Sequence, residues 1–216
     1  MAVLKKQSLV DQIYDEIRGQ IVGLELPFES KLNVSELQEK FGVSSTPIRE
    51  AINRLQKEGL VEYENNVGAR IIGITSKDVQ EIQEVAFALD CGAVRYAMRK
   101  GKNHEIAAEI LECINGYKNA ETNSERAKCA TAISEVFYKY AENSRLSGNA
   151  NLISGQHRMI RCIYSRQDAR VSSYQDFMEI YNGVLNNDSQ AVMDALENNA
   201  LKARKVIIEA LENKTY

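Results

Sequence analysis

Three segments near the start of the chain place apolar residues three or four positions apart, a spacing typical of amphipathic helices. They cover 8–22, 31–41 and 44–58, and the Gly42-Val43 turn joins the second to the third as in a helix-turn-helix. Asn33 and Ser44 stand at predicted N-caps. The expected inward residues are Leu9, Ile13, Ile17 and Ile21; Val34, Leu37 and Phe41; and Ile48, Ala51, Ile52 and Leu55.

Two strand-like segments follow, over 61–64 and 69–74, with turn residues at 65–68. They predict a β-hairpin with Gly68 at its tip and Arg70 just behind it. A helix-turn-helix followed by such a hairpin is a winged helix.

From Thr75 onward the pattern is helical. Thr75 and Asp78 predict a capping box that opens a helix to about Lys100. Further helices are expected over 104–117, 125–143, 149–166, 169–186 and 189–211, with a turn at 147–149. Asn103, Ser124 and Asp188 are the predicted N-caps of the first, second and last of these helices. Their inward positions include Val85, Tyr96 and Leu152. The predicted fold class is mainly α: a winged helix-turn-helix over 1–74, then an all-α antiparallel bundle over 75–216.

The composition fits a soluble globular protein, with 44% hydrophobic and 26% charged residues. We expect a cytoplasmic protein without a membrane segment, because no apolar run is long enough for a signal peptide or a transmembrane helix. Four separated cysteines, without a C-x-x-C pair, are interpreted as reduced thiols.

The charge balance does not favour a nucleic-acid protein, since the net charge is −3. Residues 1–74 carry nine Lys and Arg against eleven Asp and Glu. DNA binding would therefore depend on a local cationic patch and on dimerisation, and non-specific binding should be weak.

The run VS-x-TP-I-REA-x-x-RL-x-x-EGLV, followed by G-A-x-I, resembles the DNA-binding domain of the GntR family of bacterial repressors. The resemblance implies a homodimer that binds a palindromic double-stranded DNA operator. We expect Arg49 to contact guanine, whereas Arg54 could contact phosphate or pair with Glu50 or Glu58. Ser45 replaces a common family arginine, which puts the usual operator sequence in doubt. The predicted DNA-binding residues are Ser44, Ser45, Thr46, Arg49, Asn53, Arg54, Gly68 and Arg70.

The helical second half resembles the FCD effector-binding domain of FadR-like regulators, in the shorter, VanR-like six-helix form. Many such domains hold a divalent metal with one Asp and three His. Here the matching positions carry Ser134, Tyr138, Phe177 and Asn199, so no metal is expected. The resemblance implies a small-molecule effector, a carboxylic acid in most of the family. The predicted ligand-binding residues are Arg95, Tyr138, His157, Arg161, Phe177, Tyr181 and Asn199, although each could equally belong to an ordinary core or surface.

The two alternatives to an effector-controlled regulator are an enzyme and a binding protein without effector control. An enzyme is disfavoured because the sequence has no nucleophile elbow, P-loop, dinucleotide fingerprint or metal-ligand cluster. The other alternative is a winged-helix DNA-binding or interaction protein that has lost effector and metal control.

Overall fold

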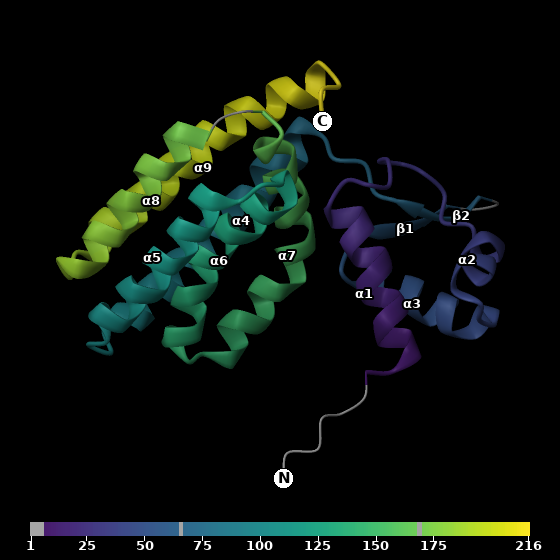
Figure 1. The fold of residues 1–216 in the computed structure, drawn as a ribbon, viewed down its shortest axis with the longest axis horizontal. Coiled ribbons are helices and arrows are strands. Elements are labelled where there is room, and N and C mark those ends of the chain that lie inside the picture. Colours follow the sequence, from purple (N-terminus) through teal and green to yellow (C-terminus); the bar gives the residue numbers. More distant parts are fainter. Residues whose placement is uncertain (1–6, 65–66, 168–169) are drawn as a thin grey trace, which may run out of the picture. The chain divides into compact units, whose positions relative to one another are not determined.

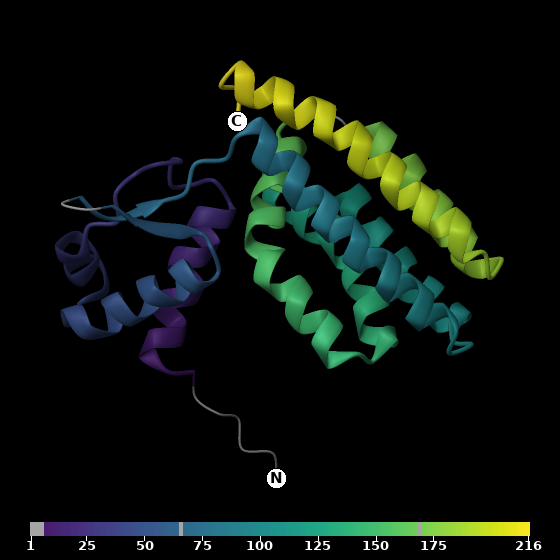
Figure 2. The same ribbon diagram turned by 180° about the vertical axis from the view of Figure 1, so that it is seen from behind.

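The computed structural model describes residues 7–64, 67–167 and 170–216. It divides the chain into two compact units, Met1–Ile74 and Thr75–Tyr216, called here the winged-helix unit and the helical unit (Figures 1 and 2). Each is described by itself. In the described part of the chain, no helix is both long and apolar enough to cross a membrane.

The winged-helix unit has the predicted order of three helices and an antiparallel hairpin, which confirms this part of the fold class. The second strand ends at Ile71, earlier than predicted, and Asn65 and Asn66 of the predicted turn lie outside the described residues. In the hairpin, Val61 lies opposite Ile71 and Glu64 opposite Gly68. The elements are α1 (Leu9–Val22), α2 (Val34–Phe41), α3 (Ser45–Lys57), β1 (Val61–Glu64) and β2 (Gly68–Ile71).

The core of the winged-helix unit is formed mainly by α1, α3 and the hairpin. α1 packs against α3, and their apolar faces are fully covered. Leu9 was expected to face inward but is 50% exposed, because it is the first residue of α1. The buried apolar side chains are Ile13, Ile17, Ile21, Val22, Leu32, Ile48, Ala51, Ile52, Leu55, Leu60, Val61, Ala69 and Ile71.

The helical unit has the predicted six helices in its described residues. α4 packs against α6, α7 and α9, while α5 packs against α6 and α8. α8 and α9 lie side by side along one side of this unit (Figures 1 and 2). The helices are α4 (Ser76–Met98), α5 (Asn103–Asn119), α6 (Asn123–Ala141), α7 (Ser144–Ser165), α8 (Arg170–Leu185) and α9 (Ser189–Glu212).

The helical unit buries Phe137 and Phe177 at its centre, where the Phe177 ring meets Tyr117 edge-on at 5.1 Å between centroids. Three predicted inward residues are exposed instead: Val85 by 48%, Tyr96 by 47% and Leu152 by 61%. On α4 the reason is geometric. The buried stripe runs through Val79, Ile82, Gln83, Ala86, Ala93, Val94 and Ala97, which places Val85 and Tyr96 together on another face.

Two predicted helix starts in this unit are confirmed. Thr75 and Asp78 form the predicted capping box, and Asp188 accepts a hydrogen bond from the Ala191 amide at the start of α9. The start of α5 differs, because Asn103 is its first helical residue and its Nδ2 donates to Asn187 Oδ1.

Two other helices begin earlier than predicted. α6 is capped by Thr122, which forms a capping box with Glu125, rather than by Ser124. α7 is capped by Asn143, so residues 147–149 lie within the helix and not in a turn.

Candidate nucleic-acid interface and ligand cavity

Helix α3 presents most of the predicted DNA-binding residues. Its apolar side is buried at Ile48 and Ile52, so its other side faces solvent. Ser45 and Arg54 are half-buried. The exposed predicted residues are Ser44, Thr46, Arg49 and Asn53.

The first turn of α3 is not capped by a side chain. Ser44 has the extended backbone of an N-cap, with φ −70° and ψ 169°, but its hydroxyl accepts no hydrogen bond from the helix. The sequence prediction of the N-cap position is correct and the predicted capping bond is absent. The first N–H groups of α3 therefore lack a side-chain acceptor from this residue.

Arg49 and Asn53 lie one turn apart on the exposed side of α3. Within the described residues, no hydrogen bond or ion pair of Arg49 is observed. Asn53 accepts a 3.3 Å hydrogen bond through Oδ1 from the Tyr63 hydroxyl of β1. This contact links the exposed side of α3 to the first strand of the wing.

Arg54 is held by α1. Its Nη1 donates to Asp11 Oδ1 at 2.7 Å, and its guanidinium lies 4.2 Å from the Tyr14 ring centroid. Hydrogen bonds from Ser8 and then Arg54 lower the pKa of the Asp11 carboxyl. The partner is therefore neither Glu50 nor Glu58, because α1 packs across α3 and brings Asp11 to the arginine.

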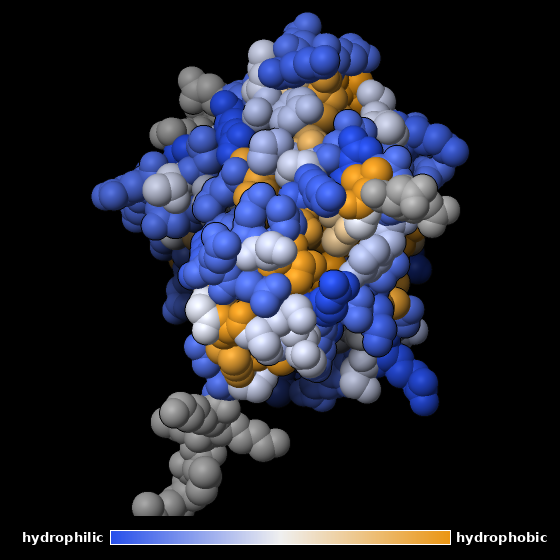
Figure 3. All heavy atoms as spheres, turned by 90° about the vertical axis from the view of Figure 1, so that its right-hand side faces the viewer, coloured by the Kyte–Doolittle hydropathy of each residue, from blue (hydrophilic) through white to orange (hydrophobic). Residues whose placement is uncertain are grey.

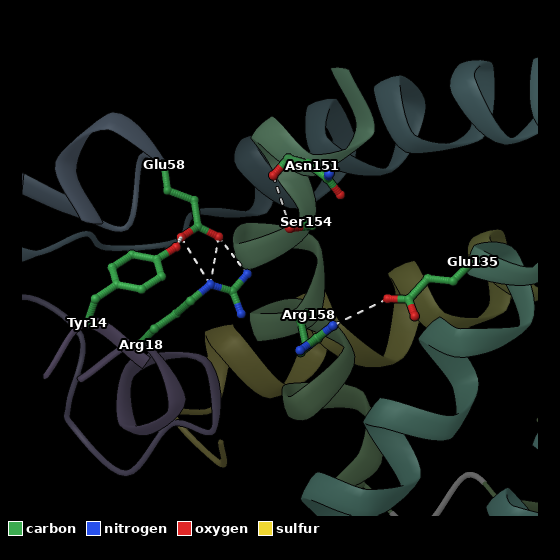
Figure 4. Close-up of polar contacts among 7 residues, drawn as sticks. All are labelled: Tyr14, Arg18, Glu58, Glu135, Asn151, Ser154 and Arg158. Atoms are coloured by element: carbon green, nitrogen blue, oxygen red, sulfur yellow. Dashed lines mark hydrogen bonds and ion pairs between the residues drawn. The ribbon is translucent and has the colours of Figure 1, made fainter. Parts of the chain in front are cut away.

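Glu58, at the end of α3, has two other partners on α1. It accepts hydrogen bonds from the Tyr14 hydroxyl at 2.7 Å and from Arg18 Nε at 2.9 Å. Figure 4 shows the phenol and the guanidinium converging on this carboxylate. The Arg18 and Glu58 side chains are only 18% and 11% exposed. The contacts among Tyr14, Arg18 and Glu58 therefore hold α1 to the end of α3.

The wing supplies one further cation. Arg70 lies 3.0 Å from Glu64 and 3.7 Å from Glu29, measured between charged nitrogen and oxygen atoms. Gly68 has φ +100°, a conformation that favours glycine and accounts for it without a DNA contact. Seen from the side of α2 and the wing, the surface is mostly hydrophilic, with apolar residues between (Figure 3).

The helical unit contains a cavity of about 120 Å³. Helices α4, α6 and α7 enclose it, and all of its walls come from this unit. Two predicted ligand residues, Tyr138 and His157, line it. The full lining is Ala86, Asp90, Thr131, Ser134, Glu135, Tyr138, Ser147, Ala150, Asn151, Ile153, Ser154 and His157.

Asp90 is the central polar group of this cavity, and it is not among the predicted ligand-binding residues. Its Oδ1 accepts from the Tyr138 hydroxyl at 2.8 Å, and its Oδ2 accepts from Ser134 Oγ at 2.9 Å. Burial raises the pKa of the Asp90 carboxyl. One sequence signal could have found it: this carboxylate falls between Ala86 and Ala93, on the buried stripe of α4.

α7 contributes His157 and two arginines close to it. Burial, followed by the charges of Arg161 and Arg158, lowers the pKa of His157 to about 3, so the imidazole is neutral at neutral pH. Arg158 lies 3.4 Å from Glu135. Figure 4 shows this pair, together with the bond from Ser154 to the Asn151 carbonyl on the same helix.

The other predicted ligand residues do not line this cavity. Arg161 Nη1 donates to Asn199 Oδ1 at 2.8 Å, and Asn199 donates to Asp176 at 3.1 Å. Phe177 is buried in the core, which Tyr181 packs against. Arg95 lies at a second cavity with Met98, Arg99, Gly101, Asn103, Asn187 and Ser189.

The four positions that the FCD resemblance matches to metal ligands have other partners here. Ser134 and Tyr138 donate to Asp90, whereas Phe177 and Asn199 face the core and Arg161. Among the described residues, no group of three or more His, Cys, Asp or Glu side chains could hold a metal ion. The donor set therefore does not fit the family's divalent metal.

Comparisons with known proteins agree with this geometry. Residues 9–71 match the model of bacterial regulatory proteins of the gntR family, and residues 81–200 match the FCD domain. The chain is 26% identical over 138 residues to the uncharacterized HTH-type transcriptional regulator YdhC of Bacillus subtilis, covering 62% of each chain. It is 28% identical over 146 residues to a probable D-xylose utilization operon transcriptional repressor of Paenarthrobacter nicotinovorans, covering 66% of this chain and 64% of that one.

The match spans somewhat under two thirds of the length of these curated relatives. Among solved structures, E. coli McbR/YncC has a TM-score of 0.80 at 15% identity, covering 94% of this chain and 99% of that chain, which shows a common fold. The FCD match alone extends over more than half of the 216 residues. The chain therefore belongs to the GntR family of bacterial regulatory proteins, in the FadR-like branch whose members carry an FCD domain behind the winged helix.

Proposed function

We propose that this protein is a homodimeric transcription factor, a repressor, that binds a palindromic DNA operator through α3 and the wing and is controlled by a small molecule in the helical unit. The family consists of transcriptional regulators, which are not enzymes. One relative is named as an operon repressor, which supports the direction of control.

One observation carries the DNA-binding part of this proposal: Arg49 is exposed on the solvent side of α3 while Ile48 and Ile52 fix that helix from below. A guanidinium in this position can donate two hydrogen bonds to guanine in the major groove. The first turn of α3 adds amides without a side-chain acceptor from Ser44, and such amides suit a phosphate.

Arg54 and Arg70 are less available for DNA contacts than the sequence predicts. Both are paired with carboxylates of their own unit, so a phosphate would have to compete with those contacts. Ser45, Thr46, Asn53 and Gly68 remain proposed contacts of the same surface.

The test begins with selection of bound sequences from random double-stranded DNA by the purified full chain. Arg49→Ala should weaken binding to the selected site by roughly tenfold to a hundredfold and relax base preference at one position. Lys57→Ala, at the exposed end of the same helix, should weaken binding to all sequences alike, because we expect this lysine to contact phosphate rather than a base. Failure to enrich any sequence at low salt would overturn the proposal.

We infer further that the effector binds without a divalent metal, because Ser134 and Tyr138 are hydrogen-bonded to Asp90 and Phe177 has no donor atom. The metal content of purified protein, measured by mass spectrometry after mild dialysis, should be well below one ion per chain. Stoichiometric zinc, nickel or manganese that restores operator control would contradict this inference.

A further inference from the structure

The side chains that line the cavity carry no positive charge at neutral pH. Asp90 and Glu135 are its ionisable carboxylates, His157 is neutral, and the described lining includes no lysine or arginine. An effector carboxylate would therefore meet two acidic side chains and no cationic side chain of the lining.

Each of the two nearby arginines has a partner through a terminal nitrogen, whereas the Nε of each has no hydrogen-bond partner among the described residues. Arg161 lowers the pKa of the Asp90 carboxyl through its charge, but its Nη1 donates to Asn199 and it is not part of the lining. Arg158 is paired with Glu135. Neither arginine lines the cavity, so the carboxylate effector expected from the family resemblance would meet no cation of the lining.

Asp90 has acceptor capacity left for a ligand. Its carboxylate receives hydrogen bonds from Tyr138 and Ser134, whereas a carboxylate can accept about four. Because burial disfavours its negative charge, a cation in contact with it would relieve that cost. An ammonium group offers three N–H donors, and hydrogen bonds between oppositely charged groups are the strongest of this kind.

The remaining walls limit the size and polarity of the ligand. Ala86, Ala150 and Ile153 line the cavity with apolar groups, and its volume is about 120 Å³. A ligand that fits has a short apolar body and one charged end. We propose that this cavity binds a small organic ammonium ion, a primary amine, whose N–H groups donate to the Asp90 carboxylate. The assignment of this amine as the effector rests on the proposed function, in which the effector binds the helical unit.

The experiment compares ligands of equal skeleton with the full-length protein at neutral pH. Isothermal titration calorimetry and thermal unfolding are followed with butylamine, butanol and butyrate, and the amine series is extended from ethyl to hexyl. The amine of best length should bind about tenfold to a hundredfold more tightly than its alcohol, as loss of a charged hydrogen-bond partner predicts. It should also raise the unfolding temperature, because it binds only the folded state.

Two matched variants assign that binding to Asp90. Asp90→Asn keeps size and polarity but removes the charge, and should lose at least about tenfold in amine affinity. Glu135→Gln makes the same change at a lining carboxylate that is already paired with Arg158, and it should keep the preference for amine over alcohol. Tyr138→Phe, which keeps the Asp90 charge, should also retain the preference for amine over alcohol, and it serves as a test if Asp90→Asn fails to fold.

The proposal is overturned if butyrate or butanol binds as tightly as butylamine, if no amine of the series binds at millimolar concentration, or if Asp90→Asn folds and retains amine affinity. Operator binding is measured separately on the same preparation. Amine binding by a protein that selects no DNA sequence would refute the proposed function as a regulator and leave the ligand class of the cavity standing.

Discussion

Single arginines in the winged-helix unit have different tasks according to their partners. Arg18 and Arg54 bind carboxylates of Glu58 and Asp11, and Arg70 lies between two acidic residues of the wing region. Arg49, in contrast, is exposed on α3. The first group stabilises the packing of α1 and the wing around the recognition helix, while Arg49 remains accessible to a base.

Replacing Arg18 with alanine tests this division. The change leaves the Glu58 carboxylate, 11% exposed, without its guanidinium. We expect it to lower the free energy of unfolding by about 2–3 kcal/mol, at or below the lower limit of about 3 kcal/mol for breaking a buried pair, because Tyr14 still donates to Glu58. Arg49→Ala should change stability by less than about 0.5 kcal/mol, as an exposed substitution does. Urea denaturation of both variants measures the difference. Equal effects would show that the Arg18–Glu58 pair contributes little.

His157 predicts a dependence of stability on pH. Its pKa is about 3 in the folded protein, below the unfolded value of 6.5, so the unfolded chain binds more protons between these values. The contribution is present above pH 6.5 and decreases as the pH falls toward 3. The free energy of unfolding should then decrease by about 1 kcal/mol per pH unit in this window from this residue alone.

The control for this prediction is His157→Gln, which cannot titrate. Asp90 acts in the opposite direction, because its raised pKa makes the folded protein bind more protons than the unfolded chain as the pH falls. The informative quantity is therefore the difference in pH slope between the two proteins. Identical slopes from pH 6.5 down to 4 would refute a neutral imidazole at His157.

Residue contacts were predictable only where they are local. The Thr75–Asp78 box was found because both partners lie within one helical turn. The Arg54–Asp11 bond joins positions 43 apart in sequence, and no periodicity encodes which carboxylate of α1 packs over that arginine. Asp90 is not predicted for a related reason: its hydrogen bonds come from hydroxyls of α6, which the sequence of α4 does not reveal.

At the scale of helices, number and order were predictable but several starts were not. The residues of 147–149 have turn chemistry, yet Asn143 caps α7 before them and the helix continues through them. The spacing of apolar residues predicts the buried stripe of α4 slightly out of register, so it places Val85 and Tyr96 inward although they are about half exposed. The spacing of apolar residues alone does not determine which face of a helix is buried.

Two glycines of the helical unit test this interpretation of α7. Gly148 lies inside the helix, exposed, and an added Cβ would meet nothing within 4 Å. Gly148→Ala should raise the free energy of unfolding by about 0.5–1 kcal/mol, because alanine loses less backbone freedom in a helix.

The matched substitution is Gly101→Ala. Its Cβ would also meet open space, but Gly101 has φ +73° after the end of α4, and this left-handed backbone should cost alanine about 1 kcal/mol. Thermal and urea unfolding of both variants measure whether each substitution raises or lowers the free energy of unfolding. If Gly148→Ala destabilised the protein like Gly101→Ala, residues 147–149 would form a turn in solution.

For the whole molecule, charge determines how DNA must be bound. The winged-helix unit has two more acidic than basic residues, and two of its arginines beside the recognition surface are neutralised by their own partners. Long-range attraction to DNA is therefore small. In the proposed dimeric mode, specific affinity comes from base contacts made twice, by two winged-helix units on one DNA molecule.

This dimeric mode predicts a strong difference between a full and a half operator. A duplex with both half-sites should bind two chains cooperatively, and a duplex with one scrambled half-site should bind at least about a hundredfold more weakly, since each mismatched position costs about 1–3 kcal/mol. With roughly two phosphate contacts per chain, the logarithm of the binding constant should fall against the logarithm of salt concentration with a slope of only about −4. Fluorescence anisotropy at several salt concentrations, with sedimentation to count chains per duplex, measures both quantities. Binding of one chain to a half-site with full affinity, or a slope near −10 (as in strongly electrostatic repressors), would show that phosphate attraction rather than paired base recognition holds this protein on DNA.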